Sequence, residues 1–190
     1  QYNSSDNSWN QLGSYIYGET PTNASYAGSS VSLSSDGTIL AIGEYGHDFG
    51  STGTNEGRVR VYEYSNSSWS QLGSQIDGDI AQEHFGRSVS LSSNGTILAI
   101  GTENSNTYTG DVRVYEYSST DVSWNQLGSQ IDGEAENDRS GISVSLSSDG
   151  TIVAIGAYAN DETADNAGHV RVYQYSSSDV SWNQLGEDID

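Results

Sequence analysis

The chain has 190 residues, with 26 acidic and 6 basic side chains and a formal net charge of −20 at pH 7. This negative charge repels phosphate, so nucleic acid and anionic membranes are unfavourable partners. The absence of Cys excludes disulfide frameworks and thiolate metal sites, and no apolar run approaches the ~18 residues that a membrane helix needs.

The beginning and the composition of the chain favour a secreted protein. The first residue is Gln1 and no signal peptide is visible, which fits a mature chain whose signal has been removed. A composition rich in Ser, Thr, Asn and Gly, without Cys or Lys, suits an exported surface protein. We therefore expect an extracellular or cell-surface location.

An internal repeat of roughly 57 residues organises the sequence. The motif Ser-Val-Ser-Leu-Ser-Ser-Asp/Asn-Gly-Thr begins at Ser30, Ser88 and Ser143. A Trp-x-Gln-Leu-Gly motif occurs four times, at spacings of 60, 55 and 58 residues. Its tryptophans, predicted to be structural, are Trp9, Trp69, Trp124 and Trp182.

Each repeat reads as four strands, which in the first copy are 30–34, 38–42, 59–64 and 69–76. The first alternates Val and Leu with Ser, which is the period of a strand with two different faces. Asp36-Gly37 predicts a type I′ hairpin turn. The second strand is apolar on both faces and should be sandwiched. No segment shows a sustained helical period, so we expect no helix.

These features predict an all-β protein, a β-propeller-type array of four-stranded antiparallel blades. Stacking blades face to face buries surfaces that one small sheet cannot bury alone. We divide the chain into an extra N-terminal strand with its connection (1–24) and three blades (25–80, 81–135 and 136–190). An open β-solenoid or sandwich array is the alternative. The extra strand suggests a window from a longer array, or pairing with a neighbouring molecule's sheet edge.

The loop between strands two and three varies most in length between copies. In an up-and-down blade it emerges on the same side as the connection to the next blade, and variable loops on a rigid scaffold commonly carry binding sites. We expect a glycan or protein ligand on this variable face. The candidate contact residues are Tyr45, His47, Phe49, His84, Tyr108 and Tyr158.

Acidic clusters at 132–138 and 161–166 offer closely spaced oxygen ligands of the kind that Ca²⁺ prefers. The candidates are Asp132, Glu134, Glu136, Asp138, Asp161 and Asp165. Ca²⁺ is the cofactor considered. No nucleophile elbow, phosphate loop or metalloprotease motif is present. An enzyme would have to be of the glycosidase type, with two carboxylates converging in a pocket.

Further residues have a structural or modification role in this interpretation. One arginine recurs in the third strand of each repeat and is expected to pair with a carboxylate such as Asp77, Asp132 or Asp190. These arginines are Arg60, Arg113 and Arg171. Four Asn-x-Ser/Thr sequons are candidates for N-glycosylation. They begin at Asn3, Asn23, Asn66 and Asn94.

The second copy carries the clearest family resemblance. Phe85-Gly86-Arg87-Ser88-Val89, Leu98-Ala99-Ile100-Gly101 and 110–115 resemble the FG-GAP repeat of integrin-α-like β-propellers. Repeats that end in Trp-x-Gln-Leu-Gly, as these do, also resemble those of large secreted microbial or algal surface proteins. The Phe-Gly pair is absent from the other copies, and the Asp-rich calcium hairpin of the family is shortened, so the family's metal sites are not carried over.

The resemblance implies a non-enzymatic extracellular recognition or adhesion module. The alternative is a structural subunit that assembles with itself into a fibre or surface layer through edge strands. A glycosidase-like enzyme is the second alternative. The expected partners are therefore an extracellular glycan or protein, or further copies of the chain.

Overall fold

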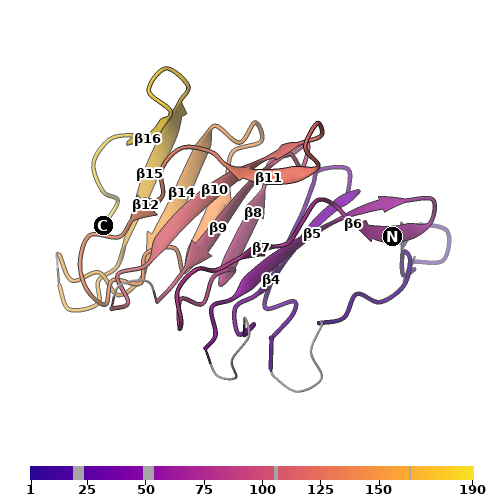
Figure 1. The fold of residues 1–190 in the computed structure, drawn as a ribbon, viewed down its shortest axis with the longest axis horizontal. Coiled ribbons are helices and arrows are strands. Elements are labelled where there is room, and N and C mark those ends of the chain that lie inside the picture. The colour runs from indigo at the N-terminus through magenta and orange to yellow at the C-terminus, as the bar shows by residue number, and fades with distance from the viewer. Residues whose placement is uncertain (19–23, 49–53, 105–106, 163) are drawn as a thin grey trace.

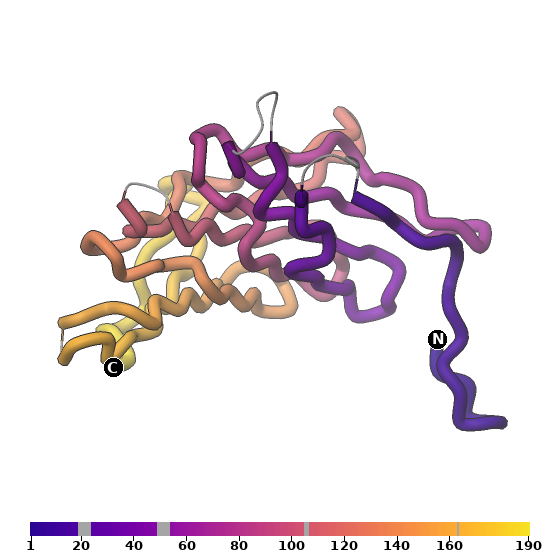
Figure 2. The backbone as a smooth tube through the Cα atoms, turned by 90° about the horizontal axis from the view of Figure 1, so that it is seen from below, coloured from indigo at the N-terminus to yellow at the C-terminus, as the bar shows by residue number. Residues whose placement is uncertain are grey.

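The computed structural model describes residues 1–18, 24–48, 54–104, 107–162 and 164–190. Within these ranges the fold is all-β and contains no helix, hence no helix that could cross a membrane. Three antiparallel sheets each hold one copy of the repeat and lie side by side as blades (Figure 1). The units follow one another in chain order across the molecule, with the two termini at opposite ends (Figure 2).

The three sheets have the same strand order. The first contains β3 (Ser30–Leu33), β4 (Ile39–Glu44), β5 (Arg58–Ser65), β6 (Ser68–Gln71) and β7 (Ile76–Asp77). The second contains β8 (Ser88–Leu91), β9 (Ile97–Thr102), β10 (Asp111–Ser118), β11 (Ser123–Gln126) and β12 (Ile131–Asp132). The third contains β13 (Ser143–Leu146), β14 (Ile152–Ala157), β15 (His169–Ser176) and β16 (Ser181–Gln184).

The fourth strand and the N-terminal segment differ from the prediction. The expected strand 69–76 is broken into β6 and β7, which both pair with β5. The single extra strand is a hairpin of β1 (Tyr2–Asn3) and β2 (Ser8–Trp9). Its Tyr2–Trp9 ring pair matches Tyr64–Trp69 of the first blade. The segment therefore reproduces the end of a third strand as well as the start of a fourth.

The type I′ assignment of the first hairpin is wrong. Gly37 has a positive φ of 73°, whereas Asp36 is not among the residues with positive φ. The Gly37 amide donates to the Ser34 carbonyl, and the Asp36 carboxylate accepts hydrogen bonds from Thr38 and from the Ser34 hydroxyl. This is a turn followed by one left-handed glycine, and it is stabilised by the aspartate side chain.

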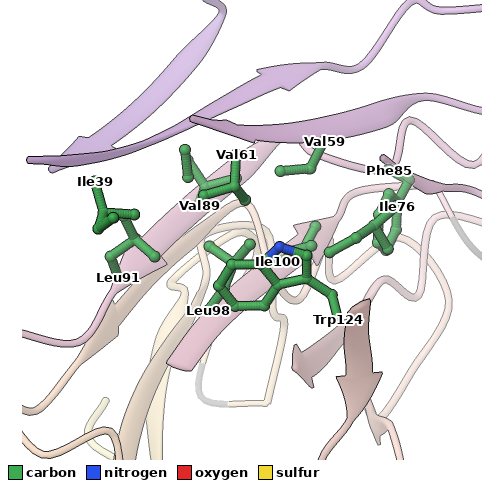
Figure 3. Packing of buried hydrophobic residues seen from close by; sticks show 11 residues of the cluster. Ile39, Val59, Val61, Ile76, Phe85, Val89, Leu91, Leu98, Ile100 and Trp124 are labelled. Atoms are coloured by element: carbon green, nitrogen blue, oxygen red, sulfur yellow. The ribbon is translucent and has the colours of Figure 1, made fainter. Parts of the chain in front are cut away.

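Each pair of neighbouring sheets shares one apolar layer. Ile39, Val59 and Val61 of the first blade face residues of the second, among them Leu91, Leu98 and Trp124 (Figure 3). An equivalent cluster joins the second and third blades. All six residues of β9 are buried because that strand is covered on both sides, as its apolar sequence predicted.

Hydrogen bonds repeat at the two junctions between blades. The Ser32 hydroxyl accepts from the Leu91 amide, and Ser90 accepts in the same way from Leu146, both at 2.9 Å. The indole of Trp124 donates to the Leu72 carbonyl at 3.0 Å, and the indole of Trp182 donates to Leu127 at 2.8 Å. In the first two blades, the serines that alternate with Val and Leu thus make polar contacts across a junction between blades.

Candidate recognition face

The loops between strands two and three lie against the connections between blades, at one end of the sheets. The Gln82 and His84 amides donate to the carbonyls of Thr54 and Asn55, and the Asn137 and Arg139 amides make the equivalent bonds to Thr107 and Tyr108. The tight turns lie at the opposite end because the strands are antiparallel. The variable end of the molecule is therefore a surface built jointly by loops and connections.

Two positions of the repeat contribute side chains to this surface in every blade. The first lies four residues before strand one, where Tyr26, His84 and Arg139 have positive φ values of 54°, 58° and 57°. The second directly follows strand two and is occupied by Tyr45, Glu103 and Tyr158. A left-handed conformation is unfavourable for bulky residues, and such strain is concentrated at functional sites.

The two positions contact each other within each blade. Tyr26 and Tyr45 stack with ring centroids 5.0 Å apart and planes 3° apart. His84 Nδ1 lies 3.2 Å from Glu103 Oε1. The Arg139 guanidinium lies 5.8 Å from the centre of the Tyr158 ring. One backbone arrangement thus presents three different chemical pairs.

Contacts between blades join these pairs into one surface, which we call the aromatic–arginine row. Arg87 lies over the Tyr45 ring at 5.1 Å and pairs with Glu103 at 3.3 Å. Arg139 is 3.8 Å from Glu103 and lies over the Tyr108 ring at 4.9 Å. The row consists of Tyr26, Tyr45, His84, Arg87, Glu103, Tyr108, Arg139 and Tyr158.

Glu103 is the anion at the centre of the row. Its pKa is lowered, first by the hydrogen bond with His84 and then by the Arg87 and His84 charges, although burial acts in the opposite direction. The carboxylate is therefore ionised at neutral pH and has no proton to donate. It pairs with the two arginines that lie over the rings of Tyr45 and Tyr108.

The row combines aromatic rings with accessible positive charge. Tyr26, Tyr108 and Tyr158 are exposed, and Tyr45 and His84 are half-buried. Arg87 and Arg139 keep 37% and 34% of their side chains exposed, whereas Arg113 keeps only 7%. A surface of this kind can stack on flat apolar groups and pair with an anion.

One predicted contact residue lies outside the row, and another falls outside the described residues. His47 is buried below the loops, and its amide donates to the Glu44 carbonyl. Phe49 lies outside the described residues, as does the sequon residue Asn23. Asn66 and Asn94 are exposed at the tight-turn end, and Asn3 is half-buried in the N-terminal hairpin.

The recurring arginines of strand three are buried and bridge structural elements. Arg113 pairs with Glu83, which is fully buried in the connection between the first two blades. Arg171 contacts Glu134 at 3.2 Å and donates to the Asp132 carbonyl at 3.0 Å. Arg60 contacts Glu44 of its own blade. The pairing partners differ from the expected Asp77, Asp132 and Asp190 carboxylates, since Asp77 pairs with Arg58.

The acidic residues considered for Ca²⁺ are spread over several local structures. Asp138 is buried and accepts from Asn160, Asp161 accepts from the Asn166 amide, and Asp132 accepts from the Gln130 side chain. Glu136 lines an open cleft of about 430 Å³ with Glu134 and Asp161. Among the described residues, the four-residue acidic and histidine cluster with metal-ligand spacing contains Glu134, together with Glu162, His169 and Asp188.

Comparison with known proteins finds a family match to part of the repeat region. Residues 131–173 match the family model of the FG-GAP repeat. This FG-GAP match covers the end of the second blade and most of the third, and it supports the resemblance first seen in the second copy. No curated protein matches the chain.

Two solved structures share the β-propeller-type fold at low sequence identity. One is a 6-phosphogluconolactonase candidate from Bacteroides fragilis, with a TM-score of 0.56 and 12% identity over 83% of this chain. The other is Saccharomyces cerevisiae Sqt1, with a TM-score of 0.51 and 14% identity over 86%. The chain spans 37% and 35% of the lengths of these two proteins. Likenesses at this level of identity show the fold alone.

Sequence reasoning missed four members of the row, Tyr26, Arg87, Glu103 and Arg139. Aligning the repeats at the start of strand one would have placed Tyr26, His84 and Arg139 at one position. The signal was available but is obscured because this position carries a different residue type in each copy.

Proposed function

We propose that this protein is a non-enzymatic extracellular recognition module that binds a glycan or protein segment through the aromatic–arginine row. The observation that carries the proposal is the placement of Arg87 and Arg139, both part-exposed, against tyrosine rings and a shared carboxylate. In a chain of net charge −20, this surface gathers accessible cations in one place. It suits a ligand with a flat face and an anionic group.

The local chemistry supports binding more than catalysis. A glycosidase-type acid needs a raised pKa so that it can hold a proton near neutral pH. The pKa of Glu103 is instead lowered by His84 and Arg87. The FG-GAP match and the repeat architecture support an extracellular recognition role, because such repeats occur in extracellular proteins.

The proposal is tested by surface plasmon resonance of the full chain against immobilised neutral and acidic glycans and extracellular-matrix proteins. We expect saturable binding to one class, reduced at least about tenfold by Tyr158→Ala, a loss of about 1.4 kcal/mol. The control variant is Val122→Ser, an exposed residue in the tight turn between β10 and β11. Equal affinity of both variants for the bound ligand would place the binding site elsewhere.

Self-assembly is a second candidate function. Val31 and Leu33 of the first blade are 61% and 57% exposed, although their equivalents Val89 and Leu91 are buried in the junction between blades. At the other end, Ser143 and Ser145 are exposed, whereas Ser88 and Ser90 bond to the next blade. The two open faces are complementary in the same way as the internal junctions, which would favour head-to-tail stacking of copies.

Sedimentation velocity over a hundredfold range of protein concentration tests this second function. Head-to-tail stacking predicts growing species that Val31→Asp abolishes and Val122→Asp does not. A single sedimenting species at all concentrations would rule out assembly through these faces.

A further inference from the structure

We propose that Glu134, Glu162, His169 and Asp188 form a binding site for a divalent first-row metal ion of the Zn²⁺ class. The four residues come from different segments: the connection after β12, the loop after β14, the start of β15 and the segment after β16. One potential ligand atom from each lies within 4.8 Å of those of the other three. This site is separate from the aromatic–arginine row and independent of the proposed recognition function.

The buried imidazole of His169 is the observation that points to a ligand. Only 1% of the side chain is exposed, and Nδ1 is buried without a hydrogen-bond partner in the part of the chain that the structure describes. Nδ1 lies 3.2 Å from Asp188 Oδ2 and 3.9 Å from Glu134 Oε2. A buried nitrogen without a hydrogen-bond partner is unfavourable, and a metal ion between these groups would satisfy it.

The backbone fixes this imidazole in place. His169 pairs with Ala157 in the β14–β15 ladder, so its ring is held at the edge of the sheet. Arg58 and Asp111 occupy the equivalent first position of strand three in the other blades. The histidine, and with it the site, therefore belongs to the third blade.

The surrounding charges are suited to a divalent cation. Arg171 Nη1 lies 3.2 Å from Glu134 Oε1, which leaves Oε2 of the same carboxylate directed toward His169. Three carboxylates and this one guanidinium leave two net negative charges around the imidazole. Arg171 orients a ligand in the way that outer hydrogen bonds orient ligands in metal sites.

The ligand types favour Zn²⁺ over Ca²⁺. Zn²⁺ binds imidazole and carboxylate at about 2.0–2.2 Å, commonly with four ligands, whereas Ca²⁺ takes oxygen ligands at longer distances. Tetrahedral bonds of that length place ligand atoms about 3.4 Å apart. Ligand atoms that are farther apart in this structure, up to 4.8 Å, must therefore move closer when the metal binds. Glu134 and Glu162 are exposed and can move inward, while His169 is fixed.

Isothermal titration calorimetry of the full chain with zinc chloride tests the site. The informative variant is Glu162→Gln, and the matched control is Glu187→Gln, since both glutamates are exposed and lie in the same acidic part of the surface. We expect one Zn²⁺ per chain, affinity reduced at least tenfold in E162Q, and unchanged affinity in E187Q. Parallel titration of Co²⁺ should give a visible absorption spectrum typical of a four-coordinate nitrogen and oxygen site.

Three outcomes would overturn the proposal. Absence of saturable one-to-one binding would show that the cluster is not a site. Equal weakening by both variants would indicate diffuse binding to the acidic surface. Tighter binding of Ca²⁺ than of Zn²⁺ would show that His169 is not a ligand.

Discussion

Leu33 and Leu91 occupy the same position of the repeat and test how the blades are stabilised. Leu91 is 7% exposed in the junction between the first two blades, whereas Leu33 is 57% exposed on the open face of the first blade. The sequence around both is Ser-Val-Ser-Leu-Ser-Ser. Substitution of each by Ala therefore changes the same atoms in two different environments.

The expected difference follows from burial. Leu-to-Ala changes in a packed core lower the free energy of unfolding by about 2–5 kcal/mol, because both transfer energy and packing are lost. Leu91 contacts a cluster that includes Val61, Leu98 and Trp124, so we expect about 3 kcal/mol for Leu91→Ala. Leu33 keeps more than half of its surface in water, and its loss should remain below about 1 kcal/mol.

Urea denaturation followed by tryptophan fluorescence measures both values, because Trp124 lies in the affected cluster. The measurement is made at low protein concentration and repeated at high concentration. Equal destabilisation by the two substitutions at low concentration would contradict the exposure of Leu33 on the first blade. A destabilisation by Leu33→Ala that appears only at high concentration would instead indicate association through that face.

Other predictions concern the turns and the close approach of blades. The pKa of Asp36 is lowered from 3.8 to about 2, first by the Ser34 hydroxyl and then by Thr38. The pKa of Asp149 is lowered to about 2 by the equivalent groups, Ser147 and Thr151. A carboxyl group whose pKa is lowered in the folded state stabilises the fold above about pH 4. This stabilisation is lost as the pH falls toward 2. Asn94 already makes the same hydrogen bonds in the second blade. Asp36→Asn combined with Asp149→Asn should therefore keep the turns and flatten the decline in stability between pH 4 and 2; an unchanged acid decline in urea titrations would disprove this. Gly101→Ala should lower stability by about 1–3 kcal/mol, because its Cβ would overlap the Gly141 carbonyl of the next blade. The Cβ of Gly156→Ala would meet only Ser143, so this variant should lose less stability. Equal losses in thermal unfolding of the two variants would contradict the close approach of the Gly101 and Gly141 backbones.

Much of the architecture was predictable because each repeat carries redundant local signals. The alternation of Ser with Val and Leu predicted strand one, and the doubly apolar Ile97–Gly101 segment predicted a strand covered on both faces, as found in β9. The break between β6 and β7 and the geometry at Asp36 were not predicted. At both places a side chain hydrogen-bonds to nearby backbone, Gln71 to the Gly73 carbonyl and Asp36 to the Thr38 amide.

The candidate site was only partly predictable. Tyr45, Tyr108 and Tyr158 were predicted because they are aromatic residues of the variable loops, and His84 because it lies in the connection that emerges on the same side. Arg139 and Glu103 were not, since their role arises from contacts between neighbouring blades. The proposed metal site joins residues up to 54 positions apart in sequence, from Glu134 to Asp188. These residues come together only when the third blade folds.

The most direct test of the account exchanges one chemical pair in the row for another. Arg139→His combined with Tyr158→Glu places the His84–Glu103 pair of the second blade at the equivalent positions of the third. Because the backbone positions are equivalent, the free energy of unfolding should change by less than about 1 kcal/mol, while affinity for the ligand found by surface plasmon resonance should fall at least tenfold. Unchanged affinity in a folded double variant would contradict recognition through the aromatic–arginine row.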